Sequence, residues 1–338
     1  MRVNIGFRKV AIILIMMSLG GCSSKGDSNK EGEIPNAALT LLSKNDTGKS
    51  FDPITTKINK QTKDYEIKKL AEKGIRRISG IATLKNITYV LDDKNDTLTA
   101  LSETYDILKR IGKTGNNEGE FTKPTAITVD ENERIYVVDS GNKRVERFDK
   151  DLNFIDSFSF KTNSDNPDFF FSHIAVDKNG RIFLSGDTID SPGVNMIDAN
   201  GKQTLIKDYF SGAVTSYLGE VYAINFGNFY RTKDKRFGYE NGENYLLKVE
   251  AKGLKIISEL PYGLGTRSFI LNKSKIFLEC SLYDELMELD FKGKYHQSLT
   301  QFDHVDSQIN TAMALGENNK LLVSNKRDSN LKVVTISE

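Results

Sequence analysis

The chain has 338 residues, with 47 Lys and Arg against 46 Asp and Glu and a formal net charge of +1. Three of the basic residues and none of the acidic ones lie in the first 21 residues, so the rest of the chain carries about −2. This balance excludes the strongly basic character typical of proteins that bind nucleic acid or other polyanions.

The N-terminus is typical of an exported protein. Three basic residues precede a short apolar run at residues 10–19, which as a helix would cover about 15 Å, half of a bilayer. A signal peptide over residues 1–21 therefore fits better than a membrane span. Leu19-Gly20-Gly21-Cys22 resembles the lipobox of bacterial lipoproteins, which implies that Cys22 is diacylated and becomes the mature N-terminus. The alternative is an ordinary secretory signal with a chance cysteine.

Two expectations follow from an acylated Cys22. Ser23 stands where an Asp would favour retention in the inner membrane, so we expect a lipid anchor in the outer membrane that faces the periplasm or the cell exterior. Cys280 is then the one remaining cysteine, which excludes an intrachain disulfide. We expect Cys280 to be a small buried thiol rather than a nucleophile.

Residues 22–63 are polar and lack sustained periodicity, which predicts a flexible tether after the lipidated N-terminus. A small apolar exception lies at residues 37–42. The remaining residues, 64–338, can be filled by one repeat array, so no second globular domain is needed.

Residues 112–149 form the clearest unit of this array. Two period-2 apolar runs are separated by the polar turn Glu131-Asn132-Glu133, and the turn Ser140-Gly141-Asn142 leads to a third short strand. The stretch resembles one blade of an NHL-repeat β-propeller. The whole chain resembles the exported NHL-like propeller lipoproteins of bacterial envelopes, whose shared fold does not fix a shared ligand.

Tyr136 in this unit is the reference position from which we locate the other units. Equivalent aromatic or large apolar residues recur with gaps of 47, 47, 39, 55 and 45 residues, and we call them anchors: Tyr89, Tyr136, Phe183, Tyr222, Phe277 and Leu322. Each anchor is followed by an apolar residue, as a buried second strand requires. The sequence thus predicts an all-β, six-bladed propeller with four-stranded antiparallel blades. The closure of the ring is open at this point, because residues 64–69 could add a strand to the last blade.

A column of hydroxyl residues lies eleven positions before the anchors. After Ile78 in the first unit it comprises Thr125, Ser172, Ser211, Thr266 and Thr311, and one place later come His173 and Arg267. Because the first strand of a blade borders the central channel, these seven polar residues are candidate ligand-binding residues at its rim. The alternative is that the hydroxyls bond local backbone at the strand ends.

The NHL resemblance brings two metal hypotheses with it. The peptidyl-hydroxyglycine amidating lyases of this type hold zinc with histidines at the column position, where this chain has hydroxyls, and His173, His296 and His304 cannot converge on one point in this register. Propeller lactonases hold calcium in the channel. Weak candidates for such a site end the second strands: Asp92, Asp139, Asn225 and Asn325. Local turn bonds are the stronger interpretation of these four residues.

The fourth unit has the largest departure from the pattern. Between Asn225 and Leu246 it contains twenty residues, where other units use about five. Aromatic and basic side chains in this segment can stack on a sugar or peptide and pair with a carboxylate. The candidates are Phe229, Tyr230, Arg231, Arg236, Phe237 and Tyr239. A long twisted hairpin that covers its own blade is the equal alternative.

The favoured function is a non-catalytic, lipid-anchored envelope module that presents the channel rim to a peptide, glycan or protein partner. The alternative is a hydrolase or lyase that uses a cation bound in the channel. No cofactor is expected apart from Ca²⁺ in that alternative, and no nucleic acid is expected as partner.

Overall fold

A computed structural model describes residues 65–162, 170–186, 193–208, 210–231, 237–240, 244–261, 264–280, 285–301, 311–325 and 329–336. For residues 227–231, 237–240 and 301 it describes the backbone alone. By contacts the chain divides into residues Met1–Ser43 and Lys44–Glu338, and every described element belongs to the second unit.

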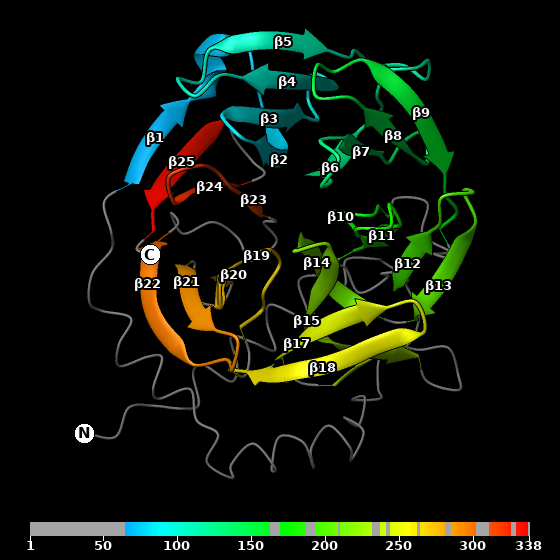
Figure 1. Ribbon diagram of the computed structural model, residues 1–338, viewed down its shortest axis with the longest axis vertical. Coiled ribbons are helices and arrows are strands. Elements are labelled where there is room, and N and C mark those ends of the chain that lie inside the picture. The colour runs from blue at the N-terminus through cyan, green and yellow to red at the C-terminus, as the bar shows by residue number, and fades with distance from the viewer. Residues whose placement is uncertain are drawn as a thin grey trace, which may run out of the picture. The chain divides into compact units, whose positions relative to one another are not determined.

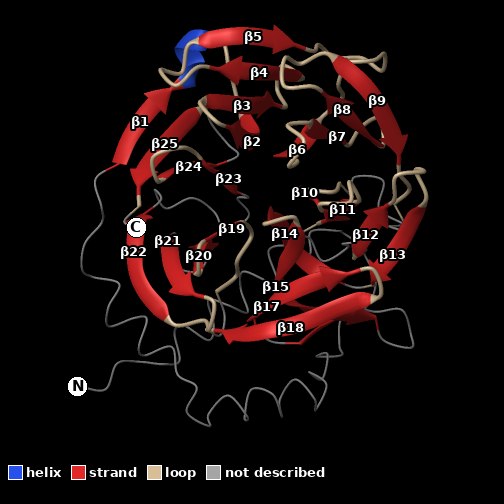
Figure 2. Cartoon of the chain, viewed as in Figure 1, coloured by secondary structure: helices blue, strands red, loops and turns tan. Residues whose placement is uncertain are grey.

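The described strands form six antiparallel sheets, five with four strands and one with five. The sheets surround a central axis, each with its first strand innermost (Figures 1 and 2). Blade 1 contains β2 (Ile78–Leu84), β3 (Ile87–Asp92), β4 (Thr97–Leu101) and β5 (Ile107–Ile111), and blade 2 contains β6 (Pro124–Val129), β7 (Ile135–Asp139), β8 (Arg144–Phe148) and β9 (Phe154–Ser159). Blade 3 contains β10 (His173–Val176), β11 (Ile182–Ser185), β12 (Val194–Ile197) and β13 (Gln203–Lys207).

Blade 4 has the additional strand. It contains β14 (Phe210–Tyr217), β15 (Glu220–Arg231), β17 (Asn244–Glu250) and β18 (Gly253–Leu260), and β16 (Phe237–Glu240) pairs with the far half of β15. Blade 5 contains β19 (Phe269–Asn272), β20 (Lys275–Cys280), β21 (Glu285–Asp290) and β22 (Tyr295–Gln301). The predicted six-bladed propeller with four-stranded antiparallel blades is confirmed.

Blade 6 is closed by the N-terminal strand. It contains β23 (Thr311–Leu315), β24 (Lys320–Asn325) and β25 (Asn330–Thr335), and its fourth strand is β1 (Tyr65–Lys69), followed by the 3₁₀ helix η1 (Leu70–Lys73). Five residue pairs join the two ends of the chain, from Tyr65 opposite Val334 to Lys69 opposite Asn330. The question of closure is thereby settled, because residues 65–69 supply the outer strand of the last blade.

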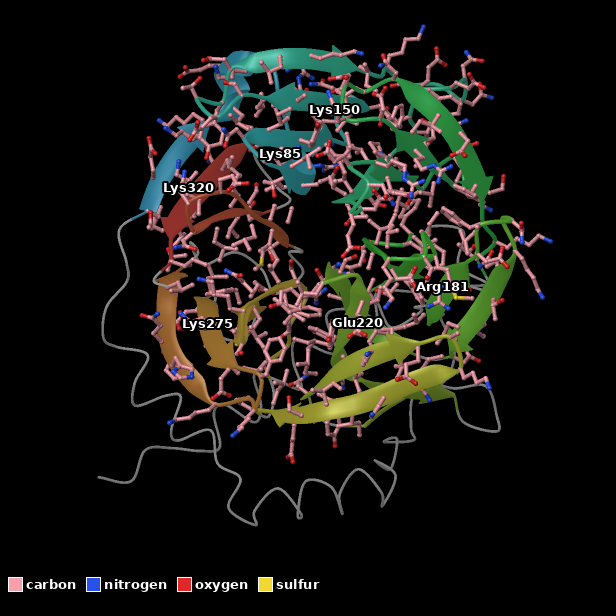
Figure 3. The ribbon with its side chains drawn as sticks, viewed as in Figure 1. Lys85, Lys150, Arg181, Glu220, Lys275 and Lys320 are labelled. Atoms are coloured by element: carbon pink, nitrogen blue, oxygen red, sulfur yellow. The ribbon has the colours of Figure 1, made fainter. Side chains whose placement is uncertain are left out.

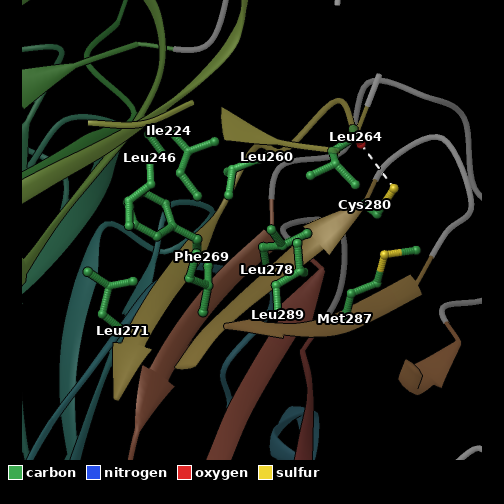
Figure 4. Close-up of a cluster of buried hydrophobic side chains, with 12 residues drawn as sticks. Ile224, Leu246, Leu260, Leu264, Phe269, Leu271, Leu278, Cys280, Met287 and Leu289 are labelled. Atoms are coloured by element: carbon green, nitrogen blue, oxygen red, sulfur yellow. Dashed lines mark hydrogen bonds between the residues drawn. The ribbon is translucent and has the colours of Figure 1, made fainter. Parts of the chain in front are cut away.

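Buried apolar side chains lie mainly between blades. Those that the structure describes form six clusters, one at each interface between neighbouring blades. Figure 4 shows the cluster between blades 4 and 5, in which Phe269 and Leu278 pack near Ile224 and Leu246. The six residues after the anchors are all fully buried, as the sequence predicts. They are Val90, Val137, Leu184, Ala223, Leu278 and Val323.

The two ends of the propeller differ in chemistry. We call the end where the first strands begin the mouth end, and the end where they turn into the second strands the turn end. Charged residues at the start of second strands are spread around the ring: Glu220, Lys275 and Lys320 begin their strands, and Arg181 directly precedes β11 (Figure 3). Because strands alternate in direction, β1 starts at the turn end, where β25 also finishes.

Aspartates fix several turns at the turn end. Asp130 Oδ1 accepts the backbone N–H groups of Asn132 and Arg134, both at 2.9 Å. Asp177 and Asp290 accept in the same way from the backbone N–H groups two and four residues after them. A short acidic side chain at the start of a turn accepts hydrogen bonds from backbone N–H groups of the turn that are not paired with a neighbouring strand. This explains why aspartate recurs there.

A buried charged cluster holds the mouth end of blade 2. Arg144 pairs with Asp139 (Nε to Oδ2, 2.9 Å) and with Glu146 (Nη2 to Oε1, 3.0 Å). Gly119 donates its N–H to Glu146 Oε1 at 3.3 Å, whereas Oε2 is buried and has no hydrogen-bond partner among the described residues. Burial raises the pKa of Glu146 to about 7 from an ordinary 4.5, although Arg144 acts in the opposite direction.

Glu146→Gln is expected to remove a pH-dependent loss of stability. The unfolded chain releases this proton near pH 4.5 and the folded protein near pH 7, so the contribution of Glu146 to the free energy of unfolding falls as the pH rises between these values. The neutral variant should therefore be more stable than the wild type at pH 8 and equally stable at pH 4. Chemical denaturation at both pH values measures this, and the same difference at both would contradict it.

Candidate functional site

A cavity follows the central channel of the propeller. It has a volume of about 340 Å³ and is lined by residues of all six first strands, β2, β6, β10, β14, β19 and β23. These strands are the innermost elements around the axis (Figure 1). The lining extends from Ser79 and Thr311 at the mouth end to Thr83 and Asn272 at the turn end, so the cavity follows the first strands over their length.

Strand pairing defines two rings of channel residues at successive depths. In the small-residue ring, each residue lies opposite the second-strand residue two positions after the anchor. The ring contains Gly80, Ala126, His173, Ala213, Ser268 and Ala312. The apolar ring lies one residue deeper and contains Ile81, Ile127, Ile174, Val214, Phe269 and Met313. All twelve residues line the cavity. Position 80 requires glycine for packing, because a Cβ atom there would lie 2.9 Å from Ile127 Cγ2.

The structure separates the hydroxyl column into two groups. Ser172 and Thr311 line the channel, whereas Thr125, Ser211 and Thr266 are not among the lining residues. Thr125 bonds the backbone of the next blade rather than that of its own turn: its Oγ1 donates to the carbonyl oxygen of Phe171 at 2.5 Å. A bulge explains the position of Thr125, because residue 125 is skipped in the strand pairing.

Three hydroxyls of the column are buried without a partner. Ser211, Thr266 and Thr311 are 1%, 0% and 4% exposed. Their Oγ atoms have no hydrogen-bond partner in the part of the chain that the structure describes. Blades 4, 5 and 6 supply one each, and Thr311 itself lines the channel. A buried hydroxyl without a partner costs free energy, so such a group indicates a ligand or an ordered water.

His173 and Arg267 lie beside this mouth. His173 belongs to the small-residue ring and is 9% exposed. Arg267 is 8% exposed and its guanidinium lies over the ring of Phe226, 4.5 Å from the centroid. The Arg267 backbone N–H donates to Glu279 Oε2 at 3.2 Å. Arg267 is therefore fixed between the two blades that flank it.

The long segment of blade 4 is a β-hairpin. The backbone of residues 228–231 in β15 pairs with residues 237–240 in β16, so the segment has the hairpin backbone that one alternative expects. The side chains of Phe229, Tyr230, Arg231, Phe237 and Tyr239 lie outside what the structure describes, as does Arg236 altogether. Phe226 joins the base of this hairpin to Arg267, so the structure brings together two predicted parts of the site.

The acidic candidates for a cation at the strand ends bind backbone instead. Asp92 accepts the N–H groups of Arg76 at 2.7 Å and Arg77 at 3.3 Å, just before β2. Asp139 accepts the N–H of Thr122 at 2.7 Å, just before β6, and pairs with Arg144. Burial raises the pKa of Asp139, and these bonds act against that rise.

Other residues at the same register position also hold nearby backbone. Asn225 Oδ1 accepts the N–H of Tyr245 at 2.8 Å, and Asn325 ends β24 in blade 6. Cys280 is fully buried, as expected, and its thiol donates to the carbonyl oxygen of Leu264 at 3.0 Å (Figure 4). Among the residues that the structure describes, no group of three or more His, Cys, Asp or Glu is arranged to hold a metal.

The remaining predicted residues lie away from the channel or outside the described ranges. His296 is on β22, with Nε2 3.5 Å from Asp290 Oδ2, and His304 is not described. Cys22 and the rest of residues 1–64 also lie outside the described residues. No helix within the described ranges has the length and apolar character needed to cross a membrane.

Six sheets around an open channel, closed by the first strand, define a six-bladed β-propeller. Residues 71–263 match the family DUF5128, described as a 6-bladed beta-propeller. The chain belongs to this family, and the predicted resemblance to NHL-type propellers is confirmed.

Similar proteins agree on the architecture. The chain is 38% identical to NHL repeat-containing protein 3 of Homo sapiens over 66 residues, which are 19% of each protein. It therefore spans less than a fifth of that relative. The structure resembles virginiamycin B lyase from Staphylococcus aureus (TM-score 0.53, 10% identity, 81% of this chain and 99% of that chain). It also resembles a gluconolactonase from Xanthomonas campestris (TM-score 0.55, 11% identity, 85% and 94%). Such low identities show the fold alone.

Replacement of two column threonines by valine should have opposite effects on stability. Thr266→Val removes a buried hydroxyl that has no described partner, so we expect the free energy of unfolding to stay level or rise by about 1 kcal/mol. Thr125→Val removes the shorter of two hydrogen bonds to the Phe171 carbonyl, the other being from Ser140 at 3.4 Å, and should lower the free energy of unfolding by about 1–2 kcal/mol. Thermal and denaturant unfolding of both variants measure this. A loss in Thr266→Val as large as that in Thr125→Val would show that Thr266 is bonded within the protein.

Proposed function

We propose that the protein is a lipid-anchored binding module of the bacterial cell envelope that holds its ligand in the central channel. The observation that carries this proposal is Thr311, a buried hydroxyl that lines an open channel of about 340 Å³ and has no hydrogen-bond partner among the described residues. Cavities of this size with a few convergent polar groups are typical of ligand sites.

The acidic residues near the mouth support binding rather than cation chemistry. Asp92 and Asp139, which the sequence offered as cation ligands, each use their carboxylate oxygens to hold the segment that leads into the first strand of their own blade. This role accounts for them without a metal. The fold likeness to a lyase and a lactonase, at about 10% identity, supports the architecture and adds nothing on the reaction.

The outer strand of blade 6, β1, starts with Tyr65 at the turn end, opposite the mouth end. The proposed partner is a peptide, glycan or protein of the envelope, and the proposed membrane contact is the lipid alone, in the outer membrane.

Cys22→Ala tests the anchor. Without the thiol no thioether-linked diacylglycerol can form, so the protein should leave the membrane fraction and lose incorporation of labelled fatty acid. Fractionation of the cells and labelling with an alkyne fatty acid measure this, with Cys280→Ala as the matched control that stays in the membrane. Unchanged membrane association of Cys22→Ala would exclude the lipid anchor.

Thr128→Phe tests ligand binding in the channel. Thr128 lines the channel and is partly exposed, so phenylalanine there narrows the lumen. The full chain in detergent is incubated separately with pools of peptides and of glycans released from the envelope, and the retained compounds are identified by mass spectrometry. We expect retention by the wild type and loss of about tenfold or more in Thr128→Phe.

Thr204→Phe is the control for this experiment. Thr204 is also partly exposed and sits on the outer strand β13, away from the lumen. It should retain the same compounds as the wild type. Equal retention by all three proteins would place binding outside the channel and contradict the proposal.

A further inference from the structure

The two rings of the channel form a chamber with an apolar floor. In the small-residue ring five of six positions are Gly, Ala or Ser, whereas the apolar ring one residue deeper is entirely Ile, Val, Phe or Met. Side chains of at most two heavy atoms leave the lumen wide at the first depth. At the second depth the residues that line the lumen are larger and apolar. A group that enters from the mouth therefore meets a wall of small residues and then a hydrocarbon surface.

The floor discriminates between ligand chemistries. Five members of the apolar ring are buried and Met313 is partly exposed. None of the six side chains can donate a hydrogen bond, so each sugar hydroxyl placed on this floor would lose its water without replacement and weaken binding about tenfold. An aliphatic group strengthens binding about fourfold for each methylene that it buries. The floor thus favours an aliphatic group over a glycan.

Polarity returns below the apolar ring. One position deeper the lining mixes the hydroxyls of Thr128 and Thr215 with Ala82, Ile270 and Ala314. Successive residues of a strand are about 3.3 Å apart. A single branched side chain spans the ring at this spacing, whereas a long acyl chain would extend past it to a partly polar wall.

The walls above the floor suit a peptide backbone. Thr311 supplies a buried hydroxyl with no described partner on the lumen, and Ser268 and His173 belong to the same wall. Each first strand is also the end strand of its sheet, so its second backbone edge borders the channel. Amide N–H and C=O groups of a peptide can bond such hydroxyls and strand edges.

We infer that the channel takes a peptide segment whose aliphatic side chain enters from the mouth and rests on the apolar ring, with its backbone bonded by the Thr311 hydroxyl. This inference rests on the proposed binding function and names its ligand class. The size and polarity of the chamber select for a leucine-like residue at the tip of the segment.

The test uses the full chain in detergent and three blocked amino acids, N-acetyl-alanine, N-acetyl-valine and N-acetyl-leucine methylamide, with N-acetylglucosamine as the glycan probe. Dissociation constants come from NMR titration of each probe. We expect affinity to rise about fourfold for each added carbon, from the alanine to the leucine probe. N-acetylglucosamine should bind more weakly than the leucine probe.

Two variants locate the effect. Met313→Gln places an amide on the floor and should weaken the leucine probe about tenfold while leaving the alanine probe nearly unchanged. Thr311→Val should weaken all three amino-acid probes by a similar factor, because their backbones are the same. Leu205→Gln, on the exposed face of β13, is the control and should change nothing. Equal melting temperatures of the variants and the wild type confirm that the fold is retained.

Two outcomes would overturn the inference. One is equal affinity for the alanine and leucine probes, and the other is an effect of Met313→Gln that does not depend on side-chain length. Tighter binding of N-acetylglucosamine, still lost in Thr128→Phe, would make the ligand a glycan and leave the proposed binding function intact. Binding of every probe that is insensitive to Thr128→Phe would instead remove the channel site, and with it the proposed function.

Discussion

The pairing of β1 with β25 is the constraint on which the propeller depends. It joins residues almost 270 positions apart and completes the sheet of blade 6. Leu70 and Ile75, which follow β1, are buried in the apolar cluster between blades 6 and 1. Without this pairing, blade 6 would keep three strands and its interface with blade 1 would lose Leu70 and Ile75. The channel has a defined radius and a complete lining because the ring is closed, so the two rings of channel residues are a consequence of this one pairing.

A second recurring device lies where the second strands end. Asp92 and Asp139 hold the chain that leads into the first strand of their blades, and the Cys280 thiol holds the carbonyl oxygen of Leu264 before β19. A carboxylate accepts from N–H groups and a thiol donates to a carbonyl oxygen, so the residue type follows which backbone group faces it. This mixture of types explains why the position looked like a set of metal ligands in the sequence.

The sequence predicted the repeating part of the fold because burial there depends on residue type. The anchors and their apolar neighbours recur at about 47 residues since each must fill an interface between blades, and the structure buries all of them except Tyr222, which is partly exposed. The channel was harder to predict, for two physical reasons. Bulges at Ser79 and Thr125 shift the register within the first strands, so a fixed offset assigned Thr125 to a wall that it does not line. The small-residue ring is mostly Gly and Ala, which occur throughout the sequence, so the ring can be recognised only once the strands are paired. His173 was found because an imidazole stands out at any depth.

The strand bounds place the irregularity of this chain at one end. The connections at the turn end span two to five residues in every blade, whereas those at the mouth end range from two residues between β13 and β14 to thirteen between β9 and β10. Both the closing strand and the aspartate turns are independent of the longer connections. Mutation can therefore lengthen, shorten or replace the segments around the mouth while the ring stays closed. A lineage built on this scaffold can acquire new ligands by indels on a single face, at little cost to folding.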